Sequence, residues 1–346
     1  MKNILYLYRE IMPHHIPVLK ELVQSGYNVT VVHVSLKKLT PYQIPFLENV
    51  NFLNKEEFTQ KMLNKLAIEL KPSVLFVCDR TNAIYNITAL LLRKRFNTPV
   101  ICGCDTQWRG GKQWANVFTA WFRHNRYYSH MLVAGMRQFE YAKKLGFENS
   151  KIIWPLYSAD LNKFNKIEID VKRFSGSKNI LFVGRFAEVK GLNILLSAWS
   201  SIQDKKGTTL TLIGSGPLKG KLSYSSDVVV HEFMSQSELL EISSKASCFV
   251  LPSIFEPWAL VIHEFAAAGL PMIVTSSCGA TIHFVLNNYN GFVVESDNVE
   301  ELKNALIRII DSDANQLFEF GKRSRELSKS ITPKMVAAAL LSVVKE

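Results

Sequence analysis

Residues 253–275 read SIFEPWALVIHEFAAAGLPMIVT and place two glutamates, Glu256 and Glu264, eight positions apart. Pro257 has a fixed φ and no backbone N–H, so Glu256 is expected in a loop that leaves a strand. The residues that follow have helical periodicity up to a Gly-Leu-Pro stop, and the apolar run after that stop reads as another buried strand. The stretch therefore predicts strand, loop, helix and strand, which is the repeating unit of an α/β fold.

The two carboxylates would lie where such a fold binds ligands. In an open α/β sheet the ligand crevice lies outside the carboxyl ends of the strands. Glu256 on the loop and Glu264 in the first helical turn would both face this crevice and accept hydrogen bonds from two sets of hydroxyls. Taken alone, Glu264 also has a structural explanation, because the helix dipole favours a carboxylate in the first turn.

Size and composition indicate a two-domain globular protein. The 346 residues exceed what one hydrophobic core usually supports, and 47% of them are apolar. Charged Arg9 and Glu10 follow only a short apolar run, so no signal peptide is expected, and no run reaches the roughly 18 apolar residues of a membrane span. Five cysteines are an odd number scattered over predicted strands. They favour a reducing, cytoplasmic location over a disulfide framework.

The net charge of +11 is concentrated in the first half of the chain. Residues 1–170 contain 23 Lys and Arg against 13 Asp and Glu, a balance of +10, whereas residues 171–346 contain 18 against 17. Such asymmetry predicts an anionic partner for the first half. Nucleic acid, an acidic glycan and anionic lipid all satisfy this criterion.

Residues 106–139 contain no acidic residue and are rich in aromatic and basic residues. Helical spacing after a Gly-Gly pair puts the aromatic side chains on one face with cations at its rim, as in an interfacial membrane helix. The alternative is that this face packs into the domain core. The chain shows no nucleic-acid-binding motif, so nucleic acid is not an expected partner. The residues expected to face a membrane are Arg109, Lys112, Trp114, Phe118, Trp121, Arg123 and Arg126.

Strands and helices alternate through the first half and predict a parallel, doubly wound sheet. The first strand-to-helix loop lacks a G-x-G-x-x-G fingerprint, so a dinucleotide site is not expected there. His14 and His15 follow the first strand, where cleft residues collect, although loop histidines are often only solvated. Asp105 closes a later strand, where it would serve either the site or an ordinary Asx turn.

The second half contains a candidate diphosphate clamp. Arg185 and Lys190 lie five positions apart on a glycine-flanked strand-to-helix turn, where a guanidinium and an ammonium can both bind phosphate oxygens. A second glycine-rich turn, 214–217, would let the backbone approach a ligand closely, but a plain tight turn also explains it. Asp311 and Asp313 have D-x-D spacing between two predicted helices. Helix capping explains them, so no metal site is expected.

The motifs E-P-W-x-L-V-x-x-E, A-x-x-x-G-x-P and G-R-F-x-x-x-K-G resemble the E-x7-E and donor-phosphate signatures of glycosyltransferase family 4. The resemblance is most specific over residues 179–294 and looser elsewhere. It implies the α/β GT-B fold, with two Rossmann-like doubly wound domains facing across a cleft and a C-terminal helix that crosses back to the first domain. The expected segments are an acceptor-side domain (1–165), a linker (166–178), a donor domain (179–330) and the last helix (331–346).

The resemblance also implies roles for individual residues. Glu264 would accept hydrogen bonds from the ribose and Glu256 from the sugar, while Arg185 and Lys190 would stabilise the departing diphosphate. Asp105 stands where members often have a histidine and is a further catalytic candidate, and His14 and His15 are weaker candidates for the acceptor side. The other expected donor-binding residues are Gly184, Gly214, Gly216, Pro257, Trp258, Ala259, Leu260 and Val261. Ala259 departs from the family, whose members often have glycine there.

The implied activity is transfer of a sugar from a UDP- or GDP-sugar to a glycan or lipid-linked acceptor, with no metal and no cofactor. Most family members are retaining enzymes. The expected setting is the inner face of the cytoplasmic membrane, in the synthesis of cell-envelope polysaccharide such as lipopolysaccharide. Two alternatives remain open. One is a nucleotide-sugar epimerase or hydrolase that needs no acceptor, and the other is a non-catalytic basic protein that binds lipid or nucleic acid.

Overall fold

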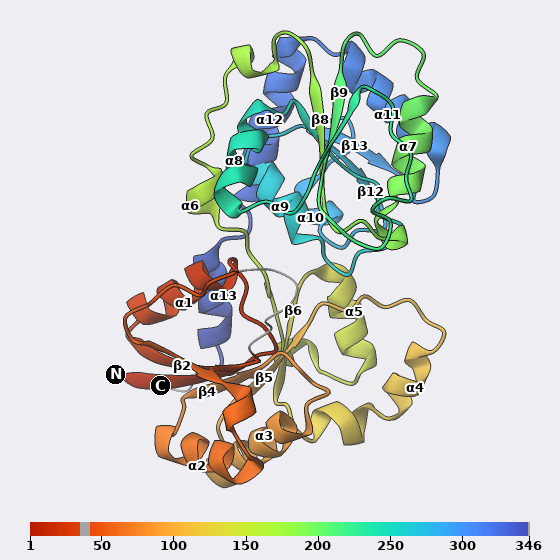
Figure 1. Ribbon diagram of the computed structural model, residues 1–346. Coiled ribbons are helices and arrows are strands. Elements are labelled where there is room, and N and C mark those ends of the chain that lie inside the picture. The colour runs from red at the N-terminus through yellow and green to blue at the C-terminus, as the bar shows by residue number, and fades with distance from the viewer. Residues whose placement is uncertain (35–41, 345–346) are drawn as a thin grey trace. The chain divides into compact units, whose positions relative to one another are not determined.

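The computed structural model describes residues 1–34 and 42–344 (Figure 1). The chain divides into two compact units, each with its own parallel sheet. The first unit comprises Met1–Ser158 together with the chain from Ile331 on, and the second comprises Ala159–Ser330. Among the described helices, none has both the length and the apolar character needed to cross a bilayer.

The sheet of the first unit has seven parallel strands in the order β3-β2-β1-β4-β5-β6-β7. Its central strands are almost continuously apolar because helices cover both faces. Figure 1 shows α1 and α13 on one face and α2 and α3 on the other. The strands are β1 Lys2–Leu7, β2 Tyr27–His33, β3 Val50–Asn54, β4 Val74–Val77, β5 Val100–Cys104, β6 His130–Val133 and β7 Ile152–Ile153. The helices are α1 His15–Gln24, α2 Gln60–Leu70, α3 Ala83–Phe96, α4 Gln113–Phe118 and α5 Met136–Lys144.

The sheet of the second unit has six parallel strands in the order β10-β9-β8-β11-β12-β13. The strand order reverses between β8 and β11, and ligands bind at such switch points in open α/β sheets. Figure 1 shows α9 and α12 on one face, with α7 and α11 on the other. The strands are β8 Asn179–Val183, β9 Thr209–Ile213, β10 Val228–His231, β11 Cys248–Leu251, β12 Met272–Thr275 and β13 Gly291–Val294. The helices are α6 Leu161–Phe164, α7 Leu192–Ser200, α8 Gln236–Lys245, α9 Leu260–Ala267, α10 Thr281–Phe284, α11 Val299–Asp311 and α12 Ala314–Ser328.

The last helix, α13 (Pro333–Leu341), belongs to the first unit, as the family resemblance implied. Thr332 caps it by accepting a hydrogen bond from the Met335 N–H at 3.2 Å, and proline occupies its first turn. Its buried residues, Val336 and Leu340 among them, lie on the face that packs against α1.

The boundary between the units differs from the expected one. The second unit begins at Ala159, so residues 166–178 are an integral part of it rather than a linker. Their polar composition is misleading because one partly buried arginine anchors them. The Arg173 guanidinium donates hydrogen bonds to the carbonyls of Ser243 at 2.6 Å and Ala268 at 2.8 Å, while neighbouring Phe174 is fully buried.

Candidate active site

Lys190 and Glu256, both predicted from the sequence, form an ion pair in the second unit. Lys190 ends a 3-10 turn, η5 (Glu188–Lys190), that follows β8, and Glu256 lies on the loop after β11. The Lys190 ammonium contacts Glu256 Oε1, and Ser253 Oγ donates to the same oxygen at 3.2 Å. The two side chains are only 20% and 12% exposed, so removing either charge would leave a poorly solvated partner.

The Glu256 loop is anchored to the loop that follows β12. The Thr275 hydroxyl donates to the Ser253 carbonyl at 2.6 Å, and the Gly279 N–H donates to the Glu256 carbonyl at 3.2 Å. Glu256 and Cys278 also form an isolated parallel bridge. These contacts hold the carboxylate at the switch point of the sheet through the backbone of a neighbouring strand end.

The Arg185 turn rests on the second glycine-rich turn. The Phe186 N–H donates to the Ser215 carbonyl at 2.9 Å. A Cβ atom at Gly214 would lie 1.9 Å from the Gly184 carbonyl oxygen, so this position needs glycine. The two glycine turns therefore form one packed platform. Arg185 projects from it with an exposed side chain and has no ion pair among the described residues.

Ala259 precedes α9 in a left-handed conformation, with φ 73° and ψ 70°. It provides no side-chain cap to this helix. A residue with a Cβ pays about 1–2 kcal/mol for this conformation, whereas glycine adopts it without that cost. The sequence showed the departure from glycine but not its consequence, which is local backbone strain directly before the helix that carries Glu264.

We expect Ala259→Gly to stabilise the protein by about 0.5–1 kcal/mol. Relief of the left-handed strain outweighs the larger entropy that glycine brings to the unfolded chain. Thermal or urea unfolding of the two proteins measures the difference. Ala267→Gly is the matched control, because Ala267 is a buried residue of the same helix and its replacement should destabilise. Destabilisation by both variants would contradict the assignment of strain to Ala259.

Glu264 lies one turn deeper in the helix than expected. It is the fifth residue of α9, which has no acidic residue in its first turn, so the helix dipole does not explain it. Its half-buried carboxyl has no ion pair or hydrogen bond among the described residues. Burial raises the pKa of Glu264 to about 7, the negative charge of Asp160 adds to the rise, and Lys163 opposes it. Glu264 thus differs from Glu256, whose charge Lys190 balances.

The raised pKa of Glu264 predicts a stability component that falls with rising pH. The folded state keeps the proton up to about pH 7, whereas an unfolded glutamate releases it near ~4.3. This component is therefore fully present below the unfolded pKa and is lost as the pH rises through about 7.

The amide in Glu264→Gln does not titrate, so the stability of this variant should not fall as the pH rises through about 7. The variant should therefore be more stable than the wild type at about pH 8. Thermal unfolding between about pH 5 and 8 compares the two proteins. Glu241→Gln is the control, because Glu241 is exposed on α8 and pairs with Lys245. Parallel stability curves for wild type and Glu264→Gln would show that the carboxyl is not perturbed by folding.

His263, adjacent to Glu264, is a positioning residue that the sequence analysis missed. Its buried imidazole accepts a hydrogen bond from the Ala159 N–H at Nδ1, at 3.1 Å, and Nε2 lies 2.8 Å from the Ser328 carbonyl oxygen. These partners require a neutral ring that donates from Nε2, and burial lowers the pKa of His263 to about 4. The ring also stacks on Phe284 at 4.1 Å. The feature of the sequence that could have indicated this role is the position of His263 within a largely apolar helix.

The three candidates in the first unit lie near one another at the switch between β1 and β4. Tyr157 Oη donates to Asp105 Oδ2 at 3.4 Å, and its ring meets the edge of His14 at 5.6 Å. The interpretation of His14 and His15 as solvated loop residues is wrong. His15 is buried, the two rings lie 4.0 Å apart, and burial lowers the pKa of His14 to about 4.

The basic aromatic segment forms a shorter helix than expected. Helix α4 ends at Phe118, and a π-helical turn, η2 (Trp121–Asn125), follows it. All seven residues predicted to face a membrane have exposed side chains. Phe118 is 80% and Trp121 is 70% exposed, so the alternative that this face packs into the core is wrong for both. Trp114, at 48%, is partly covered by the edge of Trp108.

The aspartates with D-x-D spacing have structural roles. Asp313 caps α12 by accepting from the Gln316 N–H at 2.9 Å, which confirms the capping interpretation for that residue. Asp311 pairs with Lys206 at 2.5 Å. Within residues 1–34 and 42–344, no group of three or more His, Cys, Asp or Glu side chains could hold a metal ion.

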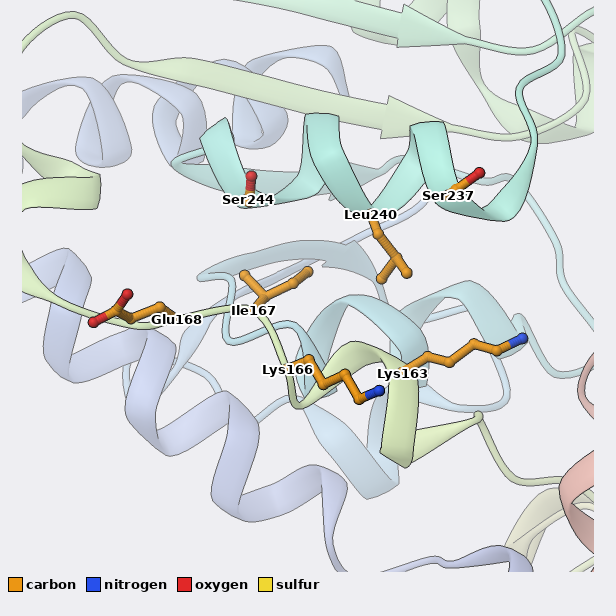
Figure 2. Close-up of a pocket in the computed structure, with 7 residues that line it drawn as sticks. All are labelled: Lys163, Lys166, Ile167, Glu168, Ser237, Leu240 and Ser244. Atoms are coloured by element: carbon orange, nitrogen blue, oxygen red, sulfur yellow. The ribbon is translucent and has the colours of Figure 1, made fainter.

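A separate cavity of about 580 Å³ lies in the second unit beside α8. Figure 2 shows Leu240 projecting from α8 toward the segment that carries Lys163, Lys166 and Ile167. None of the residues predicted for donor binding lines it. This cavity is therefore distinct from the Lys190–Glu256 site.

Comparison with known proteins identifies the second unit. A family model described as glycosyl transferases group 1 matches residues 164–327, which include the Lys190–Glu256 pair and Glu264. Over these residues the chain is similar to that family.

Individual relatives are distant. An uncharacterised glycosyltransferase of Methanocaldococcus jannaschii is 29% identical over 162 residues, which is 44% of this chain and 41% of the relative. An Escherichia coli UDP-Gal:alpha-D-GlcNAc-diphosphoundecaprenol alpha-1,3-galactosyltransferase is 29% identical over 110 residues, which is 30% of this chain and 28% of the relative. The alignments with the first three relatives span 41%, 52% and 36% of those proteins.

Structural similarity extends over the whole chain. Anabaena HepE, solved in complex with UDP-glucose, superposes with a TM-score of 0.71 at 15% identity and covers 99% of this chain and 98% of its own. The two parallel-sheet units are those of the GT-B fold, which confirms the predicted fold class.

Proposed function

We propose that this protein transfers a sugar from a nucleotide-sugar to a lipid-linked glycan acceptor during cell-envelope polysaccharide synthesis. The observation that carries the proposal is the Lys190–Glu256 pair at the switch point of the second sheet, with Arg185 on the segment between β8 and Lys190 and with Glu264 on the helix after Glu256. A nucleotide-sugar presents both diphosphate oxygens and hydroxyls. This site presents cations for the first and carboxylates for the second.

In the proposed reaction, the bond between the sugar's anomeric carbon and the diphosphate oxygen breaks, and a bond to an acceptor hydroxyl oxygen forms. Lys190 and Arg185 stabilise the negative charge that develops on the departing diphosphate, so no metal ion is needed. The acceptor hydroxyl loses its proton as it attacks. A leaving oxygen on the same face can take that proton, as in a retaining enzyme, which is the stereochemistry we propose.

The two glutamates have different proposed tasks. Glu256 accepts hydrogen bonds from sugar hydroxyls while Lys190 shifts toward the diphosphate. Glu264 accepts from the ribose as a carboxylate, so nucleotide binding should strengthen as pH rises through its pKa of about 7. A UDP-sugar is the first donor to test, because Anabaena HepE was solved with UDP-glucose.

The acceptor and setting follow from the first unit and from one relative. The Escherichia coli relative acts on a diphosphoundecaprenol-linked acceptor by its name. The exposed aromatic side chains and cations around α4 suit the anionic inner face of the cytoplasmic membrane, where each Lys or Arg contributes about 1 kcal/mol. We therefore propose that this surface docks on the membrane that carries the acceptor.

The deciding experiment is product analysis with UDP- and GDP-sugars, each with and without a lipid diphosphate-linked glycan. The proposed function predicts sugar transfer only when the acceptor is present. Consumption of the donor without an acceptor would instead indicate an epimerase or hydrolase. Thermal-shift measurements identify the nucleotide first, because a bound donor stabilises the folded state by mass action. If no nucleotide-sugar shifts unfolding, the proposed function is wrong.

A further inference from the structure

The first unit contains a polar cavity that none of the steps above uses. It has a volume of about 400 Å³ and lies beyond the carboxyl ends of β4 and β5. That volume is within the usual range for small-molecule sites, roughly 300–1,000 Å³. The lining side chains on which the argument depends are Arg80, Thr81, Asn86, Asn116, Arg123 and His124.

The cavity carries two cations that no described carboxylate neutralises. Neither Arg80 nor Arg123 forms an ion pair with any described residue. The nearby carboxylate of Asp79 is engaged by Thr81, whose N–H and hydroxyl donate to it at 3.1 and 2.6 Å. Among the described residues, the Arg123 side chain has one hydrogen-bond contact, at 3.4 Å with Asn116 Oδ1. Since a guanidinium has five N–H donors, both arginines retain donors for a ligand.

His124 adds an unsatisfied polar atom to the same wall. Its Nδ1 is buried and has no hydrogen-bond partner among the described residues. Burial, with a smaller contribution from the positive charges of Arg80 and Arg123, lowers the pKa of His124 to about 4. The ring is therefore neutral near pH 7, and an anion between the three side chains would offset the repulsion from the two arginines.

Hydrogen bonds hold the segment that carries Arg123 and His124 in a defined conformation. Arg123 and His124 lie on the π-helical turn η2, and such turns occur frequently at functional sites. The Arg93 guanidinium holds the end of this turn by donating to the carbonyls of Asn125 and, at 2.8 Å, Tyr128. On the opposite wall, Asn86 Nδ2 donates to the Arg80 carbonyl at 3.0 Å, which fixes the Arg80 backbone.

One further lining residue connects the cavity to the exposed aromatic surface. Phe122 lines the cavity and is 69% exposed. Its neighbour Trp121 and Phe118 of α4 are 70% and 80% exposed. A cavity lined by two arginines thus lies next to apolar side chains that are exposed to water. This combination matches a phosphate that is covalently attached to a hydrocarbon chain.

We propose that the Arg80–Arg123–His124 cavity binds the phosphate or diphosphate group of a membrane lipid, with the lipid's hydrocarbon chain against Phe122 and Trp121. This inference rests on the proposed function, in which that lipid carries the sugar acceptor. Two arginines can bind phosphate oxygens bidentately, and His124 can donate a further hydrogen bond. The charge of a phosphomonoester or diphosphate fits two uncompensated arginines better than that of a phosphodiester.

The test compares Arg123→Ala with Arg126→Ala in the full chain. Arg126 is exposed on the same segment, and its loss changes the net charge equally, but it does not line the cavity. Co-sedimentation uses phosphatidylcholine vesicles that contain either phosphatidic acid, a phosphomonoester, or phosphatidylglycerol, a phosphodiester, at matched surface charge. We expect Arg123→Ala to lose about tenfold in affinity for phosphatidic acid and to lose the preference over phosphatidylglycerol, whereas Arg126→Ala weakens binding to both lipids by a similar, smaller factor.

A soluble probe separates lipid phosphate from free phosphate. Farnesyl diphosphate should shift the His124 imidazole signals in NMR spectra of the wild type, and inorganic phosphate or pyrophosphate at equal concentration should compete poorly. Equal competition by pyrophosphate would overturn the lipid assignment. Equal weakening by Arg123→Ala and Arg126→Ala on both lipids would overturn the cavity as the site. Thermal unfolding confirms that each variant is folded.

Different results would refute the proposed function and the proposed lipid-phosphate site. If the wild type transfers sugar but Arg123→Ala leaves the KM for a lipid diphosphate-linked acceptor unchanged, the cavity assignment is wrong and the proposed function stands. If the wild type transfers no sugar while phosphatidic acid binding depends on Arg123, the cavity assignment stands and the proposed function is wrong.

Discussion

Replacing Lys190 with alanine is expected to lower kcat/KM for sugar transfer by about 10²–10³-fold. The ammonium forms an ion pair with Glu256, and we propose that it stabilises the negative charge on the leaving diphosphate. Its loss removes that stabilisation and also removes a cation from beside the Glu256 carboxylate, which is 12% exposed. Initial-rate kinetics with saturating acceptor and varied nucleotide-sugar measure the effect.

Lys219→Ala is the matched control for this substitution. Lys219 also forms an ion pair with a glutamate of the second unit, Glu232, but the two side chains are 49% and 76% exposed. Exposed pairs of this kind contribute little, so the control should change neither the rate nor the stability appreciably. A Lys190→Ala protein that is folded and retains wild-type turnover would remove Lys190 from the mechanism. An equal rate loss in Lys219→Ala would mean that the effect is one of general charge.

Replacing Gly214 with alanine is expected to destabilise the second unit by roughly 3 kcal/mol, at the upper end of the usual cost of overpacking. The added Cβ would lie 1.9 Å from the Gly184 carbonyl oxygen and 3.1 Å from the Phe186 ring. The first of these atoms belongs to the backbone of the strand end that leads to Arg185, so a side-chain rotation cannot relieve the clash. Differential scanning calorimetry should show a lower transition temperature, together with weaker nucleotide binding because the donor platform shifts.

Gly220→Ala separates crowding from backbone conformation. Gly220 has φ +77° in the same unit, and a Cβ there would meet no atom within 4 Å. Its replacement should therefore cost only about 1–2 kcal/mol for the left-handed backbone. Similar losses in both variants would show that the close approach of Gly214 to Gly184 is not what requires glycine.

Local patterns predicted the elements of the second unit well because its site lies on short, successive segments. The Pro257 loop, the helix that follows it and the strand after the Gly-Leu-Pro stop occur in the predicted order, as α9 from Leu260 and β12 from Met272. The proximity of Lys190 and Glu256 was also predictable in outline, since each follows a buried strand and parallel strands end at a common edge. Their direct ion pair was not, because it depends on which strands are neighbours.

Other features arise from contacts between residues far apart in the chain. The polar segment 166–178 reads as a linker until Arg173 is seen to satisfy carbonyls of residues 70 and 95 positions away. His263 becomes a positioning residue only because Ala159 and Ser328 meet its two nitrogens.

By itself, the sequence determined the parallel α/β architecture, the position of Glu256 after a strand, the cationic turn and the concentration of positive charge in the first half. Each of these depends on periodicity, on backbone restrictions at Pro and Gly, or on composition, which act within a few residues. Tertiary structure alone decided the raised pKa of Glu264, the burial of His15, and the meeting of Arg80 with Arg123 and His124 in one cavity. Desolvation and charge proximity are properties of the space around a side chain, and folding creates that space from segments that the sequence keeps apart.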